Sequence, residues 1–121
     1  MADFEIYDPY NGKIGFALAS RRGPVVHVSG MTGFRPEDMS VPDGIEEQMT
    51  LAYSNIKGIL DHFGTGLDRL IEQTVFFVSE AAPARAAFDI VSKEVFGDRP
   101  PACTMIGATA LVDPRYLAEK A

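Results

Sequence analysis

The chain has 121 residues, which is enough for one domain with a hydrophobic core and too few for two. It carries 11 basic and 17 acidic side chains, a net charge of −6, and 46% of its residues are hydrophobic. This balance is typical of a soluble globular protein. It argues against a nucleic-acid partner, because binding to phosphate backbones depends mainly on lysine and arginine. No stretch approaches the roughly 18 apolar residues of a membrane span, so we expect no membrane association.

The cysteine and histidine content limits the compartment and the metal sites. The single cysteine, Cys103, cannot form an internal disulfide, and the acidic start of the chain does not have the layout of an export signal. We therefore expect a cytoplasmic protein. One cysteine and two widely spaced histidines, His27 and His62, also make a structural zinc site improbable.

The first half of the chain predicts two strands, a loop and a helix. Residues 14–30 are typical of two short strands around a Gly-Pro turn. Residues 31–44 predict a loop, and at its end Asp43, followed by Glu46, predicts a helix N-cap with a capping box. Apolar residues then recur at helical spacing over residues 45–63, and a glycine ends the run.

The second half predicts a strand, a second helix and two closing strands. These cover residues 70–79, 82–97, 103–112 and 116–118. The order β-β-α-β-α-β-β predicts one α+β domain over residues 1–121, with two helices on one face of a sheet. A sheet covered on one side must bury its other face, and association with further copies would achieve this.

Five stretches of the chain match a known family in order and spacing: VVHVSGMTG, IEEQMTLAYSNIKGIL, QTVFFV, RPPACTMIGATAL and YLAEKA. From about residue 14 to the end, the chain resembles the RidA family, also called YjgF or endoribonuclease L-PSP-like. The resemblance implies a chorismate-mutase-like fold and a homotrimer with a cleft between each pair of subunits. It also implies hydrolytic deamination of 2-aminoacrylate and related imines to 2-keto acids, without a metal or an organic cofactor. The expected partners are therefore a small-molecule substrate and further copies of the chain.

The resemblance also assigns candidate site residues. In this family an arginine binds the substrate carboxylate and a glutamate orients water. Glu119 matches that glutamate, while Ser29 and Gly30 match a Ser-Gly pair whose backbone lines the cleft. Cys103 and Thr104 match the Arg-Ser of the family's Pro-Ala-Arg-Ser strand, so Cys103 occupies the place of the arginine.

Cys103 is the clearest departure from the family. An arginine offers a fixed cation with several donors, whereas a neutral thiol is only a weak donor. Strand alternation places Met105 on the side of Cys103. Phe16 and Ala17 stand where the family often has Pro-Tyr, so an aromatic hydroxyl is missing as well. The thiol either lines the cleft, which its residue type favours, or acts as a nucleophile, which requires a base or a cation beside it. Three arginines could hold a carboxylate from a loop instead: Arg35, Arg99 and Arg115.

Two functions follow as expectations. The first is a RidA-like enzyme that hydrolyses an enamine, an imine or a similarly activated metabolite. In it Glu119 would position water, and backbone groups near residues 29–30 and 103–107 would polarise the substrate. The alternative is a non-catalytic trimer that binds a metabolite in the same clefts, which the missing arginine favours. RNA cleavage, an activity attached to this family by name, disagrees with the acidic charge.

Overall fold

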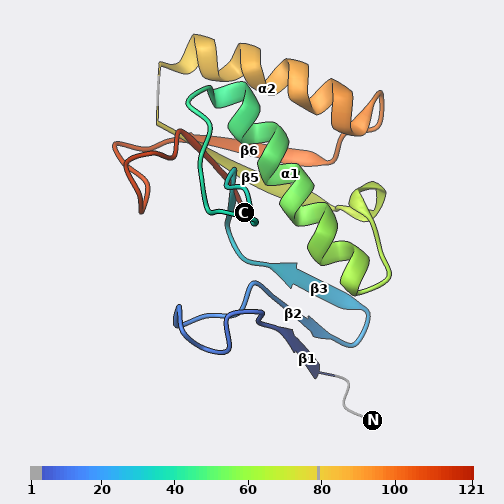
Figure 1. Ribbon diagram of the computed structural model, residues 1–121. Coiled ribbons are helices and arrows are strands. Elements are labelled where there is room, and N and C mark those ends of the chain that lie inside the picture. Colours follow the sequence, from blue (N-terminus) through green and yellow to red (C-terminus); the bar gives the residue numbers. More distant parts are fainter. Residues whose placement is uncertain (1–3, 79) are drawn as a thin grey trace.

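The computed structural model describes residues 4–78 and 80–121, which form two sheets and two long helices (Figure 1). The first sheet is an antiparallel meander of β1 (Phe4–Tyr7), β2 (Ala19–Arg22) and β3 (Val25–Val28). The second sheet is mixed and has the order β4 (Met31–Thr32), β7 (Ala118–Lys120), β5 (Glu72–Phe77) and β6 (Ala102–Gly107). The predicted α+β class is confirmed, but the single expected sheet is divided in two.

The two helices are α1 (Ile45–His62) and α2 (Ala81–Phe96), and both pack on the same side of the second sheet (Figure 1). Their buried faces share one core with inward-facing strand residues: Met49, Tyr53, Ile56, Ile59, Leu60, Ala87, Phe88, Val91, Met31, Val75 and Ala118. Apolar residues at helical spacing predicted both helices because only such spacing brings them to one face. The glycines that end them, Gly64 and Gly97, have φ of +74° and +63°, a conformation that glycine adopts readily.

The start of α1 corrects the predicted capping box. Gly44 is the N-cap residue, and no side chain donates or accepts a capping hydrogen bond there. Asp43 therefore does not cap the helix. Glu46 and Glu47 lie in the first turn, where a carboxylate interacts favourably with the positive end of the helix dipole.

Several strand boundaries also differ from the sequence prediction. Residues 14–18, predicted as the start of a strand, form a turn and bends instead. The strands β1 and β4 were not predicted because each is short and only weakly apolar. The segments predicted as strands at 70–79, 103–112 and 116–118 are shorter or shifted by up to two residues, and residue 79 lies outside the described part. Strand ends depend on pairing partners, which a single segment does not reveal.

The pairing of β5 determines which side chains face the helices. It runs parallel to β6 and antiparallel to β7. Gln73 and Val75 point toward the helices and are 6% and 0% exposed. Thr74 and Phe76 therefore point to the opposite face, which no helix of the described residues covers (Figure 1). We call this the open face.

Candidate functional site

Glu119 and Gly30, two of the candidate site residues, lie in contact. Glu119 pairs with Thr32 on β4 and with Phe76 on β5, so its side chain is on the open face. A Cβ built on Gly30 would overlap Oε1 of Glu119. Glycine is thus the residue that lets the backbone approach this carboxylate. Partial burial raises the pKa of the Glu119 carboxyl, which brings it closer to the range in which it can exchange protons at neutral pH.

Ser29 is held by hydrogen bonds to the segment before β2, whereas Phe16 in that segment is exposed. The Ser29 hydroxyl donates to the carbonyl oxygen of Ala17 at 2.7 Å, and its N–H donates to the carbonyl of Leu18 at 2.8 Å. These bonds fix the backbone just before Gly30. Phe16 is 57% exposed in the turn region before β2.

Cys103 and Glu119 lie on opposite faces of the sheet. Cys103 pairs with Gln73, whereas Glu119 pairs with Phe76, three residues further along β5. Thr104, opposite Thr74, shares the open face with Glu119. Of the predicted residues, the fold brings Glu119, Gly30 and Thr104 to the same side of the sheet and turns Cys103 away from them.

Cys103 and Met105 line a hollow of about 430 Å³ between α2 and β6, together with Arg85 and Phe88. Burial raises the pKa of the Cys103 thiol, and the charges of Lys120 and Arg85 oppose this shift only in part. The thiol is therefore mostly neutral at pH 7, and neutral thiols are weak nucleophiles. This environment fits a lining residue better than a nucleophile.

Two of the three arginines considered for binding a substrate carboxylate already form hydrogen bonds to other side chains. Arg115 holds Asp113 through Nε at 3.1 Å and Nη2 at 3.0 Å, and this partner raises the pKa of the guanidinium. Arg35 donates through Nη1 to the hydroxyl of Ser40 at 2.9 Å. Arg99 is exposed. A substrate carboxylate would have to compete with these bonds for Arg35 or Arg115.

Two amides on α1 hold the segments that carry the site. Gln48 donates to the carbonyls of Pro42 and Arg115 at 2.8 and 2.9 Å and accepts from the N–H of Leu117 at 2.7 Å. Asn55 donates to the carbonyl of Thr32 at 3.1 Å, and also to that of Phe34. Gln48 thus fixes the approach to β7, and Asn55 fixes β4. Both residues belong to the helical motif quoted above, although that motif did not reveal what they bind.

A second cluster was missed by sequence reasoning. Tyr53 donates to Oε1 of Gln73 at 2.6 Å, and the Lys120 ammonium lies 4.4 Å from the Tyr53 ring centroid and 4.8 Å from that of Phe88. Lys120 is only 1% exposed, and burial lowers its pKa to about 7. A lysine so near the end of the sequence is ordinarily assigned to solvent. The available sequence signal for its burial was its position two residues after the apolar Ala118, which places both side chains on the same face of the strand.

Two further features of the described residues bear on function. None of the helices among them is long and apolar enough to cross a membrane. Within residues 4–78 and 80–121, histidine, cysteine, aspartate and glutamate side chains form no group of three or more that could hold a metal ion.

Comparison with known sequences finds two relatives that each match 79% of this chain. The chain is 32% identical over 99 residues to the RutC family protein YjgH of Escherichia coli, covering 79% of this chain and 72% of YjgH. It is 26% identical over 96 residues to the mitochondrial protein Mmf1 of Saccharomyces cerevisiae, covering 79% of this chain and 65% of Mmf1. The chain thus spans about two thirds of the length of these relatives.

Comparison with solved structures supports the same grouping. A probable translation initiation inhibitor from Rhodopseudomonas palustris superposes with a TM-score of 0.85 at 25% identity, covering 97% of this chain and 93% of that one. The sequence profile of the family described as endoribonuclease L-PSP matches residues 11–119. That match covers nearly the whole chain, including both partners of the Glu119–Gly30 contact. The chain therefore belongs to the endoribonuclease L-PSP family, which is the YjgF/RidA family.

Proposed function

We propose that this protein catalyses the hydrolytic deamination of an enamine, an imine or a similarly activated small metabolite. The observation that carries the proposal is the Glu119 carboxylate, partly buried on the open face and packed against the backbone of Gly30. A carboxylate with a raised pKa beside exposed backbone is suited to activating water next to a polarised substrate. Membership of the YjgF/RidA family supports this chemistry.

The proposed reaction needs only water and a proton carrier. Glu119 accepts a proton from water as the water oxygen forms a bond to the carbon of the protonated imine, which gives a neutral carbinolamine. Glu119 then returns this proton to the nitrogen, the C–N bond breaks and ammonia leaves, and the hydroxyl releases its proton to solvent as the carbon becomes a carbonyl. Backbone N–H groups near Gly30 and Thr104 would stabilise charge on the substrate during these steps.

The cleft in this proposal forms between subunits of a homotrimer. The open face carries apolar side chains, including Ile106, which is 42% exposed, and Phe76 beside it in register. Burial of these side chains against another copy would remove apolar surface from water. A cytoplasmic location is also part of the proposal and rests on the single free cysteine, Cys103.

The direct test is ammonia release from freshly generated 2-aminoacrylate and from bulkier imines. We expect wild-type protein to accelerate ammonia release. Its activity should be weaker on substrates whose binding depends on a hydrogen-bonded, charge-paired carboxylate. Glu119→Gln keeps the size of the side chain and removes the base, so turnover should fall by about 100-fold or more. Equal rates for wild type and Glu119→Gln would overturn the role of Glu119, and rates equal to the uncatalysed reaction for every substrate would overturn the enzyme proposal.

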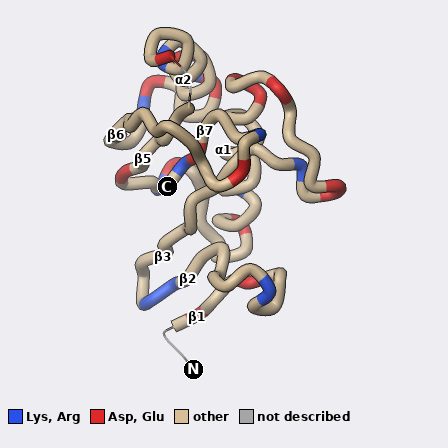
Figure 2. The backbone as a smooth tube through the Cα atoms, turned by 90° about the vertical axis from the view of Figure 1, so that its left-hand side faces the viewer, with Lys and Arg blue, Asp and Glu red and all other residues tan. Residues whose placement is uncertain are grey.

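The second candidate is a non-catalytic trimer that binds a metabolite in the same clefts. Cys103 favours it, because this residue stands at the place of the family's carboxylate-binding arginine. Its side chain points toward the helices, whereas Glu119 lies on the opposite face of the sheet. Calorimetric binding of a 2-keto acid without ammonia release from any imine would support it. RNA is a poorer candidate, because acidic and basic residues are interspersed along the chain (Figure 2) and the net charge is −6.

A further inference from the structure

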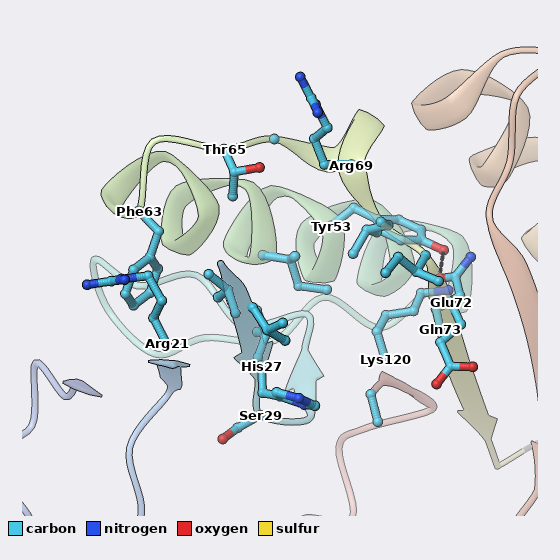
Figure 3. A pocket seen from close by; sticks show the side chains of 18 of the residues that line it. Arg21, His27, Ser29, Tyr53, Phe63, Thr65, Arg69, Glu72, Gln73 and Lys120 are labelled. Atoms are coloured by element: carbon cyan, nitrogen blue, oxygen red, sulfur yellow. Dashed lines mark hydrogen bonds between the residues drawn. The ribbon is translucent and has the colours of Figure 1, made fainter. Parts of the chain in front are cut away.

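Two neighbouring hydroxyls lie on the open face, on β5 and β6. Thr74 pairs with Thr104 in the parallel register of these strands, so both side chains point to the same side. Figure 3 shows the alternation at the start of β5, where Gln73 points toward Tyr53 and the adjacent Glu72 points the opposite way. Thr104 is exposed and Thr74 is half-buried. Neither hydroxyl has a hydrogen-bond partner among the residues that the structure describes, so both can bind a ligand.

The Glu119 carboxylate lies in the same part of the open face. Its Oε1 rests over Gly30, and the antiparallel ladder of β4 and β7 brings Gly30 beside Ala121. Ala121 in turn exchanges hydrogen bonds of 2.7 and 2.8 Å with Thr74. Gly30 and Thr74 therefore flank the same β7 residue and lie about 10 Å apart, since adjacent strands are about 4.8 Å apart. A small molecule can span that distance.

Phe76 borders the space between the carboxylate and the hydroxyls. It pairs in register with Glu119 and is the next open-face residue of β5 after Thr74. We call the surface formed by Glu119, Phe76, Thr74 and Thr104 the open-face site. It has an acid at one end, two neutral hydroxyls at the other and an aromatic ring beside them. A matching ligand has polar groups at both ends and a small apolar part.

The charges around the open-face site oppose a substrate carboxylate. Among the described residues of the second sheet, Glu119 and Glu72 are the charged side chains on the open face, whereas Lys120 points to the helices. Two acids would repel a carboxylate bound here, while Glu119 would attract the positive charge of a protonated imine. Threonine hydroxyls donate and accept hydrogen bonds without carrying a charge, so they suit a neutral polar group.

We propose that the substrate is a small imine or enamine that carries a carboxamide instead of a carboxylate, and that Thr74 and Thr104 bind this amide. The inference rests on the proposed deamination, because it places the imine carbon next to Glu119. An amide offers a carbonyl that accepts from one hydroxyl and an NH₂ group that donates to the other. The attacking water fits between the imine carbon and Glu119, with the amide at the far end of the site.

The first test measures the binding of two product analogues. Pyruvamide and pyruvate are the deamination products of the amide and of the acid, and they differ only in the group that the threonines would contact. Titration calorimetry of wild-type protein should give a dissociation constant about tenfold or more lower for pyruvamide than for pyruvate. Equal or tighter binding of pyruvate, or no binding of pyruvamide, would overturn the proposal.

Valine variants test the role of the two threonines. Thr74→Val and Thr104→Val each remove a hydroxyl and keep the branched shape. Each should weaken pyruvamide binding about fivefold or more and change pyruvate binding by about twofold or less. Thr50→Val, at an exposed position of α1, is the matched control and should change neither constant. Equal effects of all three variants would contradict the assignment, and the wild-type comparison decides the question if a valine variant does not fold.

Rates of ammonia release separate this inference from the proposed deamination. Wild type should hydrolyse 2-aminoacrylamide with a kcat/KM about tenfold or more above that for 2-aminoacrylate. A preference for the acid, with loss of turnover in Glu119→Gln, would overturn the inference about the amide and leave the deamination standing. Amide-selective binding through both threonines, without ammonia release from either compound, would overturn the deamination and support the binding of an amide at the open-face site.

Discussion

The carboxylate of Glu119 rests against the α-carbon of Gly30, so residue 30 has no room for a Cβ while the carboxylate keeps its place. Gly30→Ala should displace Glu119 and lower the rate of imine hydrolysis by about tenfold or more. The fold should survive, because the obstructing atoms belong to the end of a flexible side chain. Ammonia release and thermal unfolding measure the two effects.

The matched control is Gly58→Ala on the exposed side of α1, where a Cβ meets nothing within 4 Å. It should leave the rate unchanged and raise stability by about 0.5–1 kcal/mol. If both alanine variants retained full activity, the contact between Gly30 and Glu119 would have no part in catalysis.

Glu119 should also determine how activity depends on pH. As a base it works only when ionised, and burial raises the pKa of its carboxyl. The rate should therefore fall as the pH drops through a value above the ordinary range of glutamate. A profile of kcat/KM against pH, collected on an imine that does not titrate in that range, checks this. A flat profile down to the ordinary pKa of glutamate would rule out Glu119 as the titrating base.

Cys103→Ser should leave most of the activity intact. The thiol faces the helices, on the other side of the sheet from Glu119, and burial keeps it mostly protonated. Serine is close in size, so the packing in the hollow under α2 should persist. A loss of turnover on the order of 100-fold, with unchanged thermal unfolding, would show instead that the thiol takes part in the reaction.

Lys120→Met should stabilise the protein, most clearly at and below neutral pH. Burial lowers the pKa of Lys120 to about 7 from an ordinary value of 10.5. The unfolded chain therefore binds more protons than the folded chain between these values, so wild-type stability rises with pH through this window. Below pH 7 the full cost of burying the charge, roughly 3–5 kcal/mol, is present.

Chemical denaturation of wild type and Lys120→Met at several pH values measures this difference. The gap between the two free energies of unfolding should be largest near pH 6 and should shrink toward pH 10. Loss of the cation–π contacts with Tyr53 and Phe88 offsets part of the gain, by about 1–2 kcal/mol. A variant less stable than wild type at pH 6 would show that these contacts outweigh the desolvation of the ammonium.

Ile106→Glu should disrupt the proposed trimer. Its side chain is 42% exposed on the open face, where we expect a neighbouring subunit to cover it. A buried unpaired carboxylate there would strongly oppose association. Light scattering should give a trimer for wild type and a smaller species for the variant. Ile90→Glu, at a 48% exposed position of α2, is the control and should remain trimeric. A monomeric wild type would contradict the assembly itself.

Much of the fold follows from local patterns in the sequence. Both helices were predicted within a residue or two, because their apolar spacing and the glycines that end them are local signals. The two strands β1 and β4 were not predicted, since they have too few residues to show alternation and owe their existence to β2 and β7. The N-cap was misassigned because Gly44 adopts the extended cap conformation itself.

The candidate site was only partly predictable, because a side chain's face depends on strand register. Alternation alone grouped Cys103 with Met105, but it could not relate either residue to Glu119 on another strand. That relation required the pairing of β6 and β7 with β5. The burial of Lys120 was equally hidden, because it results from α1 and α2 meeting over β7.

The position of β7 has a consequence for how the protein folds. This strand lies between β4 and β5, and its ladder joins residue 31 to residue 120. Such a distant pairing carries a large loop-closure entropy before any contact compensates for it. The parallel β5–β6 pair with its α2 crossover can form earlier, from a shorter stretch of chain. We expect β7 to insert last, which makes the closing of the sheet the slow kinetic step.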